Sequence, residues 1–363
     1  MSKKNTRIVC FHLFNDFSGS PKVLRAVLQG LLDDGYDIDL YSSSTPGVLN
    51  KLNSSLGRLN FSKYKYSFSN NKLHTLLRLV KAQCKMFRYG LGYSRTDNVV
   101  FYVNTLLPVA AAIAGRIRGI KVIYHYHEDA HKKGIGYRFL ARLMQMLASE
   151  IICVSEYQRK FLKRTHNVSV IPNALGQNLH RSLKPHIERA FEEKNILMLA
   201  SLKGYKGVNE FINMSKSLSD FKFTLVLNED NDVVARYLSH QEVPQNLSIY
   251  SRQNKVANFY NNASLVLNLS DKRSFVETFG LTVLEAMTAA LPVIVPTVGG
   301  VAEMVEDGVN GYKIDIQDSD KIESKIKDIL LNKSIYVRLS ESALAKAEQY
   351  SYSQMLLSIK SLI

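Results

Sequence analysis

The sequence predicts an α/β protein made of two Rossmann-like domains, each with a doubly wound parallel sheet, that face each other across a cleft. The chain has 363 residues, which is enough for two domains of ordinary size. Short β-rich segments alternate with helical segments in both halves, a pattern typical of parallel sheets covered by helices. A polar stretch at residues 174–194 interrupts the alternation, and we interpret it as the connection between the domains.

The first segments predict the opening of a βαβ unit. A strand is expected at 7–14, a helix at 22–35 that ends at Gly35, and a second strand at 36–43. Gly19 lies in the loop before the helix, where a glycine allows a ligand to approach the backbone closely. The G-x-G-x-x-G pattern of dinucleotide-binding folds is absent from this loop, so nicotinamide dinucleotide binding is not supported.

A polar insertion and an amphipathic helix follow. Residues 45–72 are rich in Ser, Asn, Lys and Tyr and are expected to form a loop. Residues 72–90 have the spacing of a helix with one basic and one apolar stripe. Two interpretations remain open: an ordinary domain helix with a basic outer face, or a helix that rests on an anionic membrane surface. The apolar stripe consists of Leu73, Leu76, Leu77, Val80, Cys84 and Phe87.

The alternation continues to the end of the second half. The expected domains are 1–178 and 179–345, with the helix 346–363 completing the first domain. Further strands are expected at 98–104, 121–129, 151–155, 168–173, 195–202, 221–228, 246–251, 264–270, 292–296 and 311–315. Further helices are expected at 106–119, 137–150, 156–165, 207–218, 253–263 and after residue 279.

The charge is concentrated in the first half. Residues 1–180 hold 26 Lys and Arg against 10 Asp and Glu, whereas residues 181–363 hold 21 against 22. This asymmetry predicts an anionic partner for the first half, such as phospholipid or a phosphorylated substrate, although a merely soluble basic surface is the alternative. Nucleic acid is disfavoured as a partner because no nucleic-acid-binding motif is present.

Three dispersed cysteines, Cys10, Cys84 and Cys153, are interpreted as reduced core thiols. The sequence also has no signal-peptide pattern and no apolar run of membrane-spanning length. Together with the reduced cysteines, these observations predict a location in the cytoplasm.

Residues 274–313 contain a series of short motifs. Glu277 and Glu285 are eight positions apart with Phe-Gly between them, and the series continues with P-V-I, G-G-x-x-E and E-D-G-x-N-G. This order resembles the nucleotide-sugar-binding half of the retaining family 4 glycosyltransferases of GT-B architecture. The resemblance extends more loosely over nearly the whole chain, through H-E-D at 127–129, V-I-P-N at 170–173 and K-G at 206–207.

The two glutamates have a physical role in such a site. A helix that begins near Phe279, Gly280 and Leu281 presents unpaired N–H groups and a positive dipole end to a diphosphate. Glu277 can then accept hydrogen bonds from sugar hydroxyls, and Glu285 from a ribose diol, which are the roles that the resemblance implies. The alternative is that both are solvated surface charges.

Three further residues are expected at the diphosphate. Lys206 matches the phosphate-binding lysine of the family, and its cation would neutralise charge on the departing nucleotide diphosphate. The family usually has an arginine about five residues earlier, where this chain has Ser201. Lys203 is a possible substitute, although a lysine cannot reproduce a bidentate guanidinium contact.

Three histidines lie close together in the first half. His127 aligns best with the single donor-contacting histidine of the family, whereas His125 is expected to share its face of the strand in a supporting role. A zinc site formed by His125, His127, His131 and Glu128 is a weaker alternative, and no metal is expected. Gly19 matches a family glycine near the donor phosphates.

The resemblance implies a retaining, hexosyltransferase-type enzyme that uses a nucleotide-diphosphate sugar, with UDP favoured over GDP and no cofactor. The resemblance also implies that domain 179–345 binds the nucleotide-sugar donor and that domain 1–178 binds the acceptor. The expected acceptor is a lipid-linked or polysaccharide precursor in surface glycan biosynthesis. The expected location is the cytoplasm, with peripheral contact to the membrane through helix 72–90 as a further expectation. Alternatives are another GT-B enzyme, such as an epimerase or phosphorylase, and a partner-dependent sugar-nucleotide-binding subunit.

Overall fold

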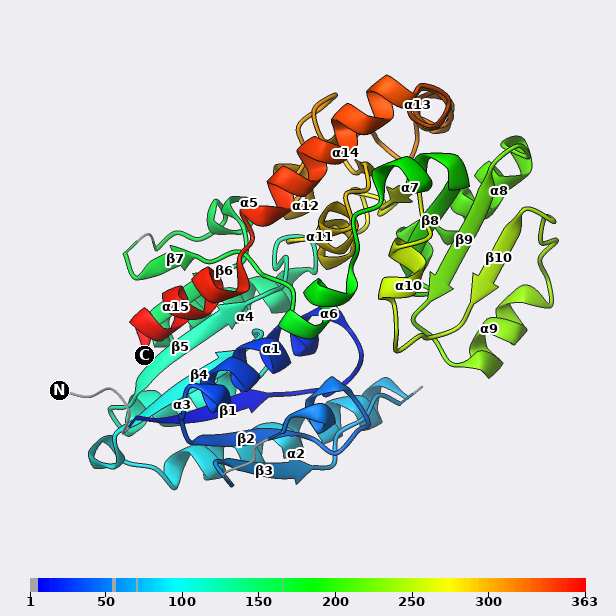
Figure 1. The fold of residues 1–363 in the computed structure, drawn as a ribbon. Coiled ribbons are helices and arrows are strands. Elements are labelled where there is room, and N and C mark those ends of the chain that lie inside the picture. Colours follow the sequence, from blue (N-terminus) through cyan, green and yellow to red (C-terminus); the bar gives the residue numbers. More distant parts are fainter. Residues whose placement is uncertain (1–5, 54–56, 70, 165) are drawn as a thin grey trace. The chain divides into compact units, whose positions relative to one another are not determined.

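The computed structural model describes residues 6–53, 57–69, 71–164 and 166–363. Two compact units divide the chain: the first comprises residues up to Asn173 together with Ser353–Ile363, and the second comprises Ala174–Tyr352. Each unit contains one parallel sheet covered by helices, so the predicted fold class is confirmed (Figure 1). Residues 54–56 and 70 of the expected loop and residue 165 of the helix expected at 156–165 lie outside the described residues.

The first sheet has seven strands in the order β3-β2-β1-β4-β5-β6-β7, and all neighbouring pairs are parallel. Because the strands are parallel, their carboxyl ends share one edge of the sheet. In register, His12 pairs with Asn104, and Asn104 pairs with His125. The bounds are β1 Arg7–His12, β2 Ile38–Ser43, β3 Leu59–Tyr64, β4 Val99–Asn104, β5 Lys121–Tyr126, β6 Glu150–Cys153 and β7 Val168–Val170.

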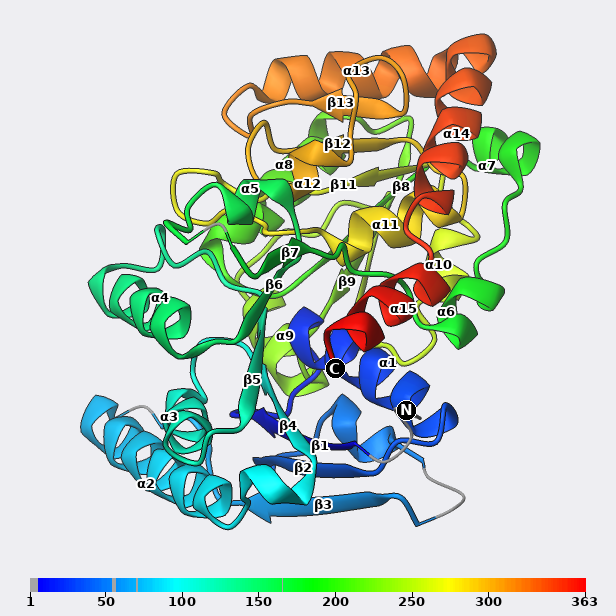
Figure 2. The ribbon, with the colours of Figure 1, turned by 90° about the vertical axis from the view of Figure 1, so that its left-hand side faces the viewer.

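Helices cover both faces of this sheet. On one face, α1 (Gly19–Asp33) lies beside α15 (Tyr352–Leu362), and a 2.8 Å ion pair joins Lys360 to Asp34 after α1 (Figure 2). On the other face, α2 (Lys72–Leu91), α3 (Val109–Ile117) and α4 (Ile135–Leu147) pack in a row. α2 and α3 approach closely because Gly90 has no side chain: a Cβ on Gly90 would lie 2.7 Å from the Cβ of Ala114.

The structure corrects three sequence-based predictions in this unit. The expected loop 45–72 contains β3 and a short 3-10 helix, η2 (Val48–Lys51). In the described part of the helix expected at 156–165, residues 156–164, the helix is only one turn, α5 (Glu156–Arg159). Cys10 and Cys153 are buried as expected, but Cys84 is exposed on α2, so it is not a core thiol.

The apolar stripe of α2 does not face the core of the unit. An ordinary domain helix would turn its apolar stripe to the core, yet Leu73, Leu76, Leu77 and Val80 are each more than half exposed. The buried side is formed by smaller or more flexible residues, Ala82, Met86 and Gly90. The stripe is therefore an exposed apolar surface.

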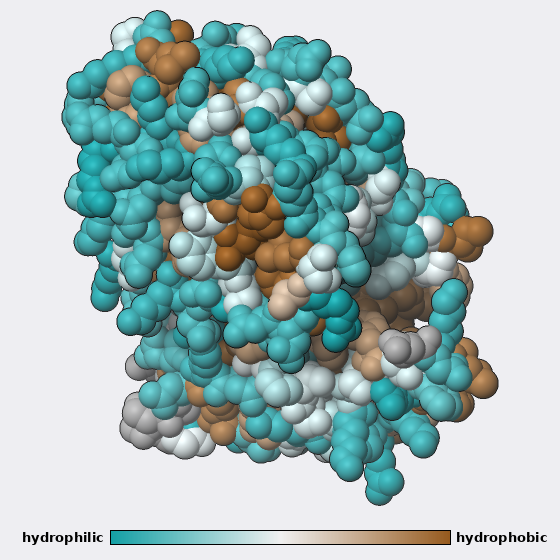
Figure 3. All heavy atoms as spheres, turned by 90° about the vertical axis from the view of Figure 1, so that its right-hand side faces the viewer, coloured by the Kyte–Doolittle hydropathy of each residue, from teal (hydrophilic) through white to brown (hydrophobic). Residues whose placement is uncertain are grey.

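Figure 3 shows one face of the molecule, on which polar residues predominate and apolar residues form separate groups.

The second sheet has six parallel strands in the order β10-β9-β8-β11-β12-β13. Six of its helices were not contained in the sequence-based prediction: α6 and α7, within the stretch interpreted as a connection, and α9, α12, α13 and α14. The strands are β8 Asn195–Ala200, β9 Lys222–Leu227, β10 Leu247–Tyr250, β11 Leu265–Leu267, β12 Val293–Val295 and β13 Gly311–Lys313. The helices are α6 Gln177–Ser182, α7 Ile187–Glu193, η4 Gly204–Lys206, α8 Val208–Ser217, α9 Asn231–Leu238, α10 Ala257–Tyr260, α11 Leu281–Thr288, α12 Gly300–Glu303, α13 Ser319–Leu331 and α14 Lys333–Glu348.

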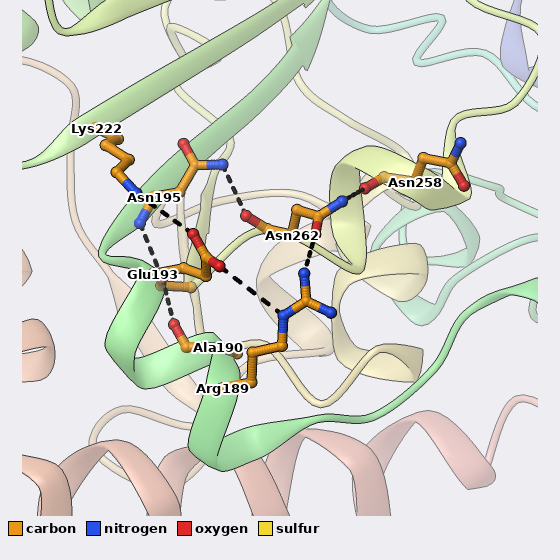
Figure 4. A network of polar contacts seen from close by, with 8 residues as sticks. Arg189, Ala190, Glu193, Asn195, Lys222, Asn258 and Asn262 are labelled. Atoms are coloured by element: carbon orange, nitrogen blue, oxygen red, sulfur yellow. Dashed lines mark hydrogen bonds and ion pairs between the residues drawn. The ribbon is translucent and has the colours of Figure 1, made fainter.

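A network of polar contacts holds α7 at the amino end of β8 (Figure 4). Glu193 forms ion pairs with Arg189 and with Lys222. Arg189 donates to Asn262 at 2.7 Å, and the side chain of Asn195, the first residue of β8, donates to the carbonyl oxygen of Asn262 at 2.8 Å. The network lies at the end of β8 opposite to the loop that carries Lys206. We therefore assign it a structural role.

Among the described residues, no helix is both long and apolar enough to cross a membrane.

Candidate functional site

The start of α11 has the backbone geometry that the motif predicts. The helix begins at Leu281, directly after Gly280, whose φ of 103° lies in the left-handed region. A Cβ at position 280 would lie 2.7 Å from the side chain of Val301, so both conformation and space require glycine here. Phe279 is buried with its ring edge-on to Tyr350 at 5.6 Å. The first N–H groups of α11 therefore follow a tight, well-packed turn.

Glu277 is held by its backbone and by its side chain. Its carbonyl oxygen accepts a 2.8 Å hydrogen bond from Gly300 N, and a Cβ on Gly299 would overlap that oxygen. The Gly-Gly motif thus lets a second loop approach the backbone of Glu277. The carboxylate oxygen Oε1 forms an ion pair with Lys206 and accepts from Ser270 Oγ at 3.3 Å.

Lys206 reaches Glu277 from the loop after β8. It ends the η4 turn and precedes Gly207, which has a φ of 73° and where a Cβ would collide with Leu269. Its ammonium lies 4.1 Å from the centre of the Phe275 ring, which stacks on Tyr205. A cation over an aromatic face is attracted by the ring quadrupole. Carboxylate and ring together keep the ammonium beside Glu277, so two of the predicted site residues meet.

Glu285 is buried rather than solvated. It is 4% exposed, and its Oε2 accepts a 2.5 Å hydrogen bond from the hydroxyl of Tyr260, which is fully buried. Burial raises the pKa of Tyr260 well above its usual value, so the phenol is a donor at neutral pH. The interpretation of Glu285 as a solvated surface charge is therefore wrong. Nothing in the sequence pattern indicated Tyr260 as its partner.

The two polar residues upstream of Lys206 are placed differently. Ser201 follows β8 directly, and its carbonyl oxygen accepts from Lys203 N at 2.8 Å. Lys203 is exposed and starts the η4 turn, whereas the Lys206 side chain is largely covered. Of these two lysines, Lys206 is thus the one that the fold directs to Glu277.

In the first unit, histidines gather at the carboxyl edge of the sheet. Asn104 lies between two of them: its amide nitrogen is 3.0 Å from His12 Nδ1, and its oxygen is 3.0 Å from His127 Nε2. The rings of His125 and His127 are 4.1 Å apart, which confirms that they share a face. His125 Nδ1 contacts the Tyr102 hydroxyl at 2.7 Å.

Gly19, the predicted glycine near the donor phosphates, is the first residue of α1. It follows β1 and is exposed.

These imidazoles are neutral at physiological pH. Burial lowers the pKa of His125 to about 3 and the pKa of His127 well below its ordinary value. Burial also lowers the pKa of His12. A neutral imidazole can donate and accept hydrogen bonds but does not supply a positive charge. Any contact that His127 makes with a ligand is thus a hydrogen bond rather than a charge interaction.

The acidic residues after His127 hold loops. Buried Glu128 accepts from Leu106 N at 3.1 Å and thereby fixes the turn at Thr105, whose φ is 73°. Asp129 accepts from the backbone N–H groups of His131 and Lys132 and from the Tyr157 hydroxyl. In the described ranges, no three His, Cys, Asp or Glu side chains are arranged to hold a metal ion.

Comparison with known proteins gives matches to both halves of the chain. Residues 17–175 match the family described as Glycosyltransferase Family 4, and residues 182–346 match the family described as Glycosyl transferases group 1. An uncharacterized glycosyltransferase from Methanocaldococcus jannaschii is 26% identical over 237 residues, which are 63% of this chain and 63% of that protein. A sucrose synthase from Melioribacter roseus is 42% identical over 94 residues, which are 24% of this chain and 12% of that protein.

The chain therefore spans 12% and 63% of the lengths of these two relatives. Among solved structures, that of HepE from Anabaena in complex with UDP and glucose has a TM-score of 0.78. It is 18% identical, and the match covers 98% of each chain. At this identity the similarity establishes a common fold.

Proposed function

Because the chain belongs to the glycosyltransferases of GT-B fold, with a Family 4 half and a group 1 half, we propose that it transfers a sugar with retention of configuration. The donor is a nucleotide-diphosphate sugar, with a UDP sugar favoured. The acceptor is a lipid-linked or polysaccharide precursor of a surface glycan. The observation on which this proposal depends most is the Lys206–Glu277 pair on the second unit, which also carries the glycine-started helix α11.

The residues of the second unit fit the donor. The N–H groups at the start of α11 and the ammonium of Lys206 supply positive charge for a diphosphate. Glu277 lies in the turn before α11 and supplies a carboxylate for sugar hydroxyls, while Ser270 restrains the same carboxylate. His127 of the first unit is assigned a hydrogen bond to the donor sugar as a neutral imidazole.

The reaction follows from this charge distribution. The bond between the anomeric carbon and the diphosphate oxygen breaks, and an acceptor oxygen bonds the same face of that carbon. The acceptor proton passes to the leaving diphosphate oxygen, which balances the step. Lys206 and the α11 N–H groups stabilise the negative charge that grows on the diphosphate, and preorganised electrostatic stabilisation of this kind often accounts for most of an enzyme's rate enhancement. No protein nucleophile is required.

A thermal-shift panel tests the donor site. UDP, GDP, ADP and their glucose conjugates are each added to the protein at millimolar concentration. A ligand at 100 times its Kd stabilises the folded state by about 2.7 kcal/mol, so we expect a rise in Tm of several degrees, largest for UDP or its conjugate. If no nucleotide raises Tm, the chain has no donor site of this kind and the proposed function is wrong.

Ser201 motivates a second candidate function. The family usually has an arginine at this position, and serine removes one cationic contact to the diphosphate. A sugar-nucleotide-binding subunit that depends on a partner for catalysis would tolerate this loss. Donor binding without turnover against any acceptor would favour this candidate. Restoration of the cation by Ser201→Arg is expected to raise activity if the chain is itself the catalyst.

The surface of the first unit supports a membrane-held acceptor. Helices α2, α3 and α4, which pack in a row, carry eight Lys and Arg residues and no Asp or Glu. Each of them also exposes large apolar side chains, a combination typical of surfaces that lie on anionic lipid. We call this surface the three-helix face. Its exposed apolar residues are Leu73, Leu76, Leu77, Val80, Ile113, Ile117, Ile135, Phe139 and Met146.

Vesicle binding tests the three-helix face. At low salt we expect the protein to sediment with phosphatidylcholine vesicles that contain phosphatidylglycerol, and not with phosphatidylcholine alone. The variant Lys81→Glu/Lys85→Glu is expected to bind at least ten-fold more weakly, because each basic residue near an anionic surface contributes about 1 kcal/mol. The control Lys321→Glu/Lys327→Glu makes the same charge change on α13 of the second unit and should change binding less than two-fold. Equally weak binding of wild type to both vesicle types would contradict the proposed membrane contact.

A further inference from the structure

A buried pair of side chains adjoins the helix of the proposed donor site. Tyr260 lies in the one-turn helix α10 before β11, and Glu285 lies in the second turn of α11 after β11. The phenol donates to Oε2 of the carboxylate at 2.5 Å, and the two residues are 0% and 4% exposed. A buried carboxylate is costly unless donors stabilise it, so this contact has a large influence on the position and charge of Glu285.

We propose that Tyr260 is a positioning residue that fixes the Glu285 carboxylate for recognition of the ribose hydroxyls of the donor nucleotide. The inference rests on the proposed function, because it assigns a partner to the ribose-binding role of Glu285. Tyr260 itself does not touch the ligand. It acts by holding one carboxylate oxygen, so that the carboxylate keeps one orientation as an acceptor.

The chemistry of the pair favours positioning over a merely structural role. A phenol has few rotatable bonds and is a strong donor, so it restrains its acceptor at little entropic cost. Burial raises the pKa of Tyr260 and keeps it protonated beside the carboxylate. A carboxylate recognises a ribose diol by accepting hydrogen bonds from its two hydroxyl groups. Such recognition requires a fixed orientation of the carboxylate.

The test compares two nucleotides and two proteins. Dissociation constants of UDP and 2′,3′-dideoxy-UDP are measured by calorimetry for wild type and for Tyr260→Phe. If the thermal-shift panel selects GDP or ADP, the corresponding pair is used. We expect Tyr260→Phe to bind UDP about ten-fold more weakly, the size of one charged hydrogen bond, and to bind dideoxy-UDP within two-fold of wild type. Tyr336→Phe, which alters another fully buried tyrosine of the same unit, should leave both constants unchanged.

Two results would overturn the inference: equal weakening of UDP and dideoxy-UDP, or no weakening of either. If Tyr260→Phe does not fold, Tyr260→Met replaces it, because an unbranched apolar side chain adapts to the buried site without supplying the phenol donor. A loss confined to the ribonucleotide again supports the inference, and an unchanged ratio overturns it. Wild type that binds no nucleotide would instead show that the proposed function is wrong.

Discussion

Replacement of Lys206 with alanine is expected to lower kcat about 10²–10³-fold, the range found when one preorganised donor to a developing anion is removed. The reason is that the Lys206 ammonium is held beside Glu277 by an ion pair and by the Phe275 ring, so it needs no reorganisation when the diphosphate departs. The measurement is the steady-state rate with the nucleotide sugar that the thermal-shift panel identifies. Because the effect belongs to the transition state, kcat should fall more than KM rises.

The control for this prediction separates charge from folding. Lys203→Ala removes an exposed lysine three residues away and is expected to change kcat less than three-fold. The Tm of both variants is measured, since Lys206→Ala also leaves Glu277 without its ion-pair partner. A loss of activity in the lysine 203 variant that equals or exceeds the loss in the lysine 206 variant would reverse the two assignments.

Replacement of Glu277 with glutamine is expected to lower kcat/KM about 10²-fold. Glutamine keeps the size and one acceptor of the side chain but loses the charge that pairs with Lys206 and strengthens hydrogen bonds to sugar hydroxyls. The measurement is donor turnover, with UDP binding as a second readout. UDP lacks the sugar, so its Kd should change much less than kcat/KM.

The matched control for Glu277 is Ser270→Ala. It removes the 3.3 Å hydrogen bond to the same carboxylate oxygen but leaves the charge in place, and we expect a loss of ten-fold or less. If Glu277→Gln retains full kcat/KM, the carboxylate does not contact the sugar. If UDP binding falls in parallel with turnover, Glu277 acts on the nucleotide and not on the sugar.

Much of the fold could be predicted because alternation of segment type is a local property of the chain. β-Rich runs such as residues 195–200 and helical runs such as residues 208–217 are distinguished by their own composition and periodicity. The long helices α13 and α14 were missed although their own periodicity is helical, whereas other errors fall where local signals are weak. β3 has only two large apolar residues before Tyr64, and its strand conformation depends on pairing with β2. The short helices α6 and α7 lie in a polar stretch that composition alone did not separate from a connection.

The residues of the candidate site were predictable where short linear motifs carry them, but the contacts between those motifs were not. Gly280 and Glu277 stand at fixed offsets from a helix start, and the conformations required of them are local. Their partners come from distant segments. Lys206 reaches Glu277 from the loop after β8, and Asn104 lies between His12 and His127 because β1, β4 and β5 are neighbours in the sheet. No spacing in the sequence encodes such contacts.

The sequence by itself determined the two parallel sheets, the glycine turn at the start of α11 and the concentration of positive charge in the first half, because each depends on composition or short-range spacing. The tertiary structure alone decided which stripe of α2 is exposed and which side chains hold Glu277 and Glu285. The periodicity of a helix shows which apolar side chains share a face, but it does not show what packs against that face. Small residues such as Gly90 and Ala82 can face the core instead when a neighbouring helix packs closely. Likewise, a glutamate in a motif has no fixed orientation until another segment supplies its donor, as Tyr260 does for Glu285.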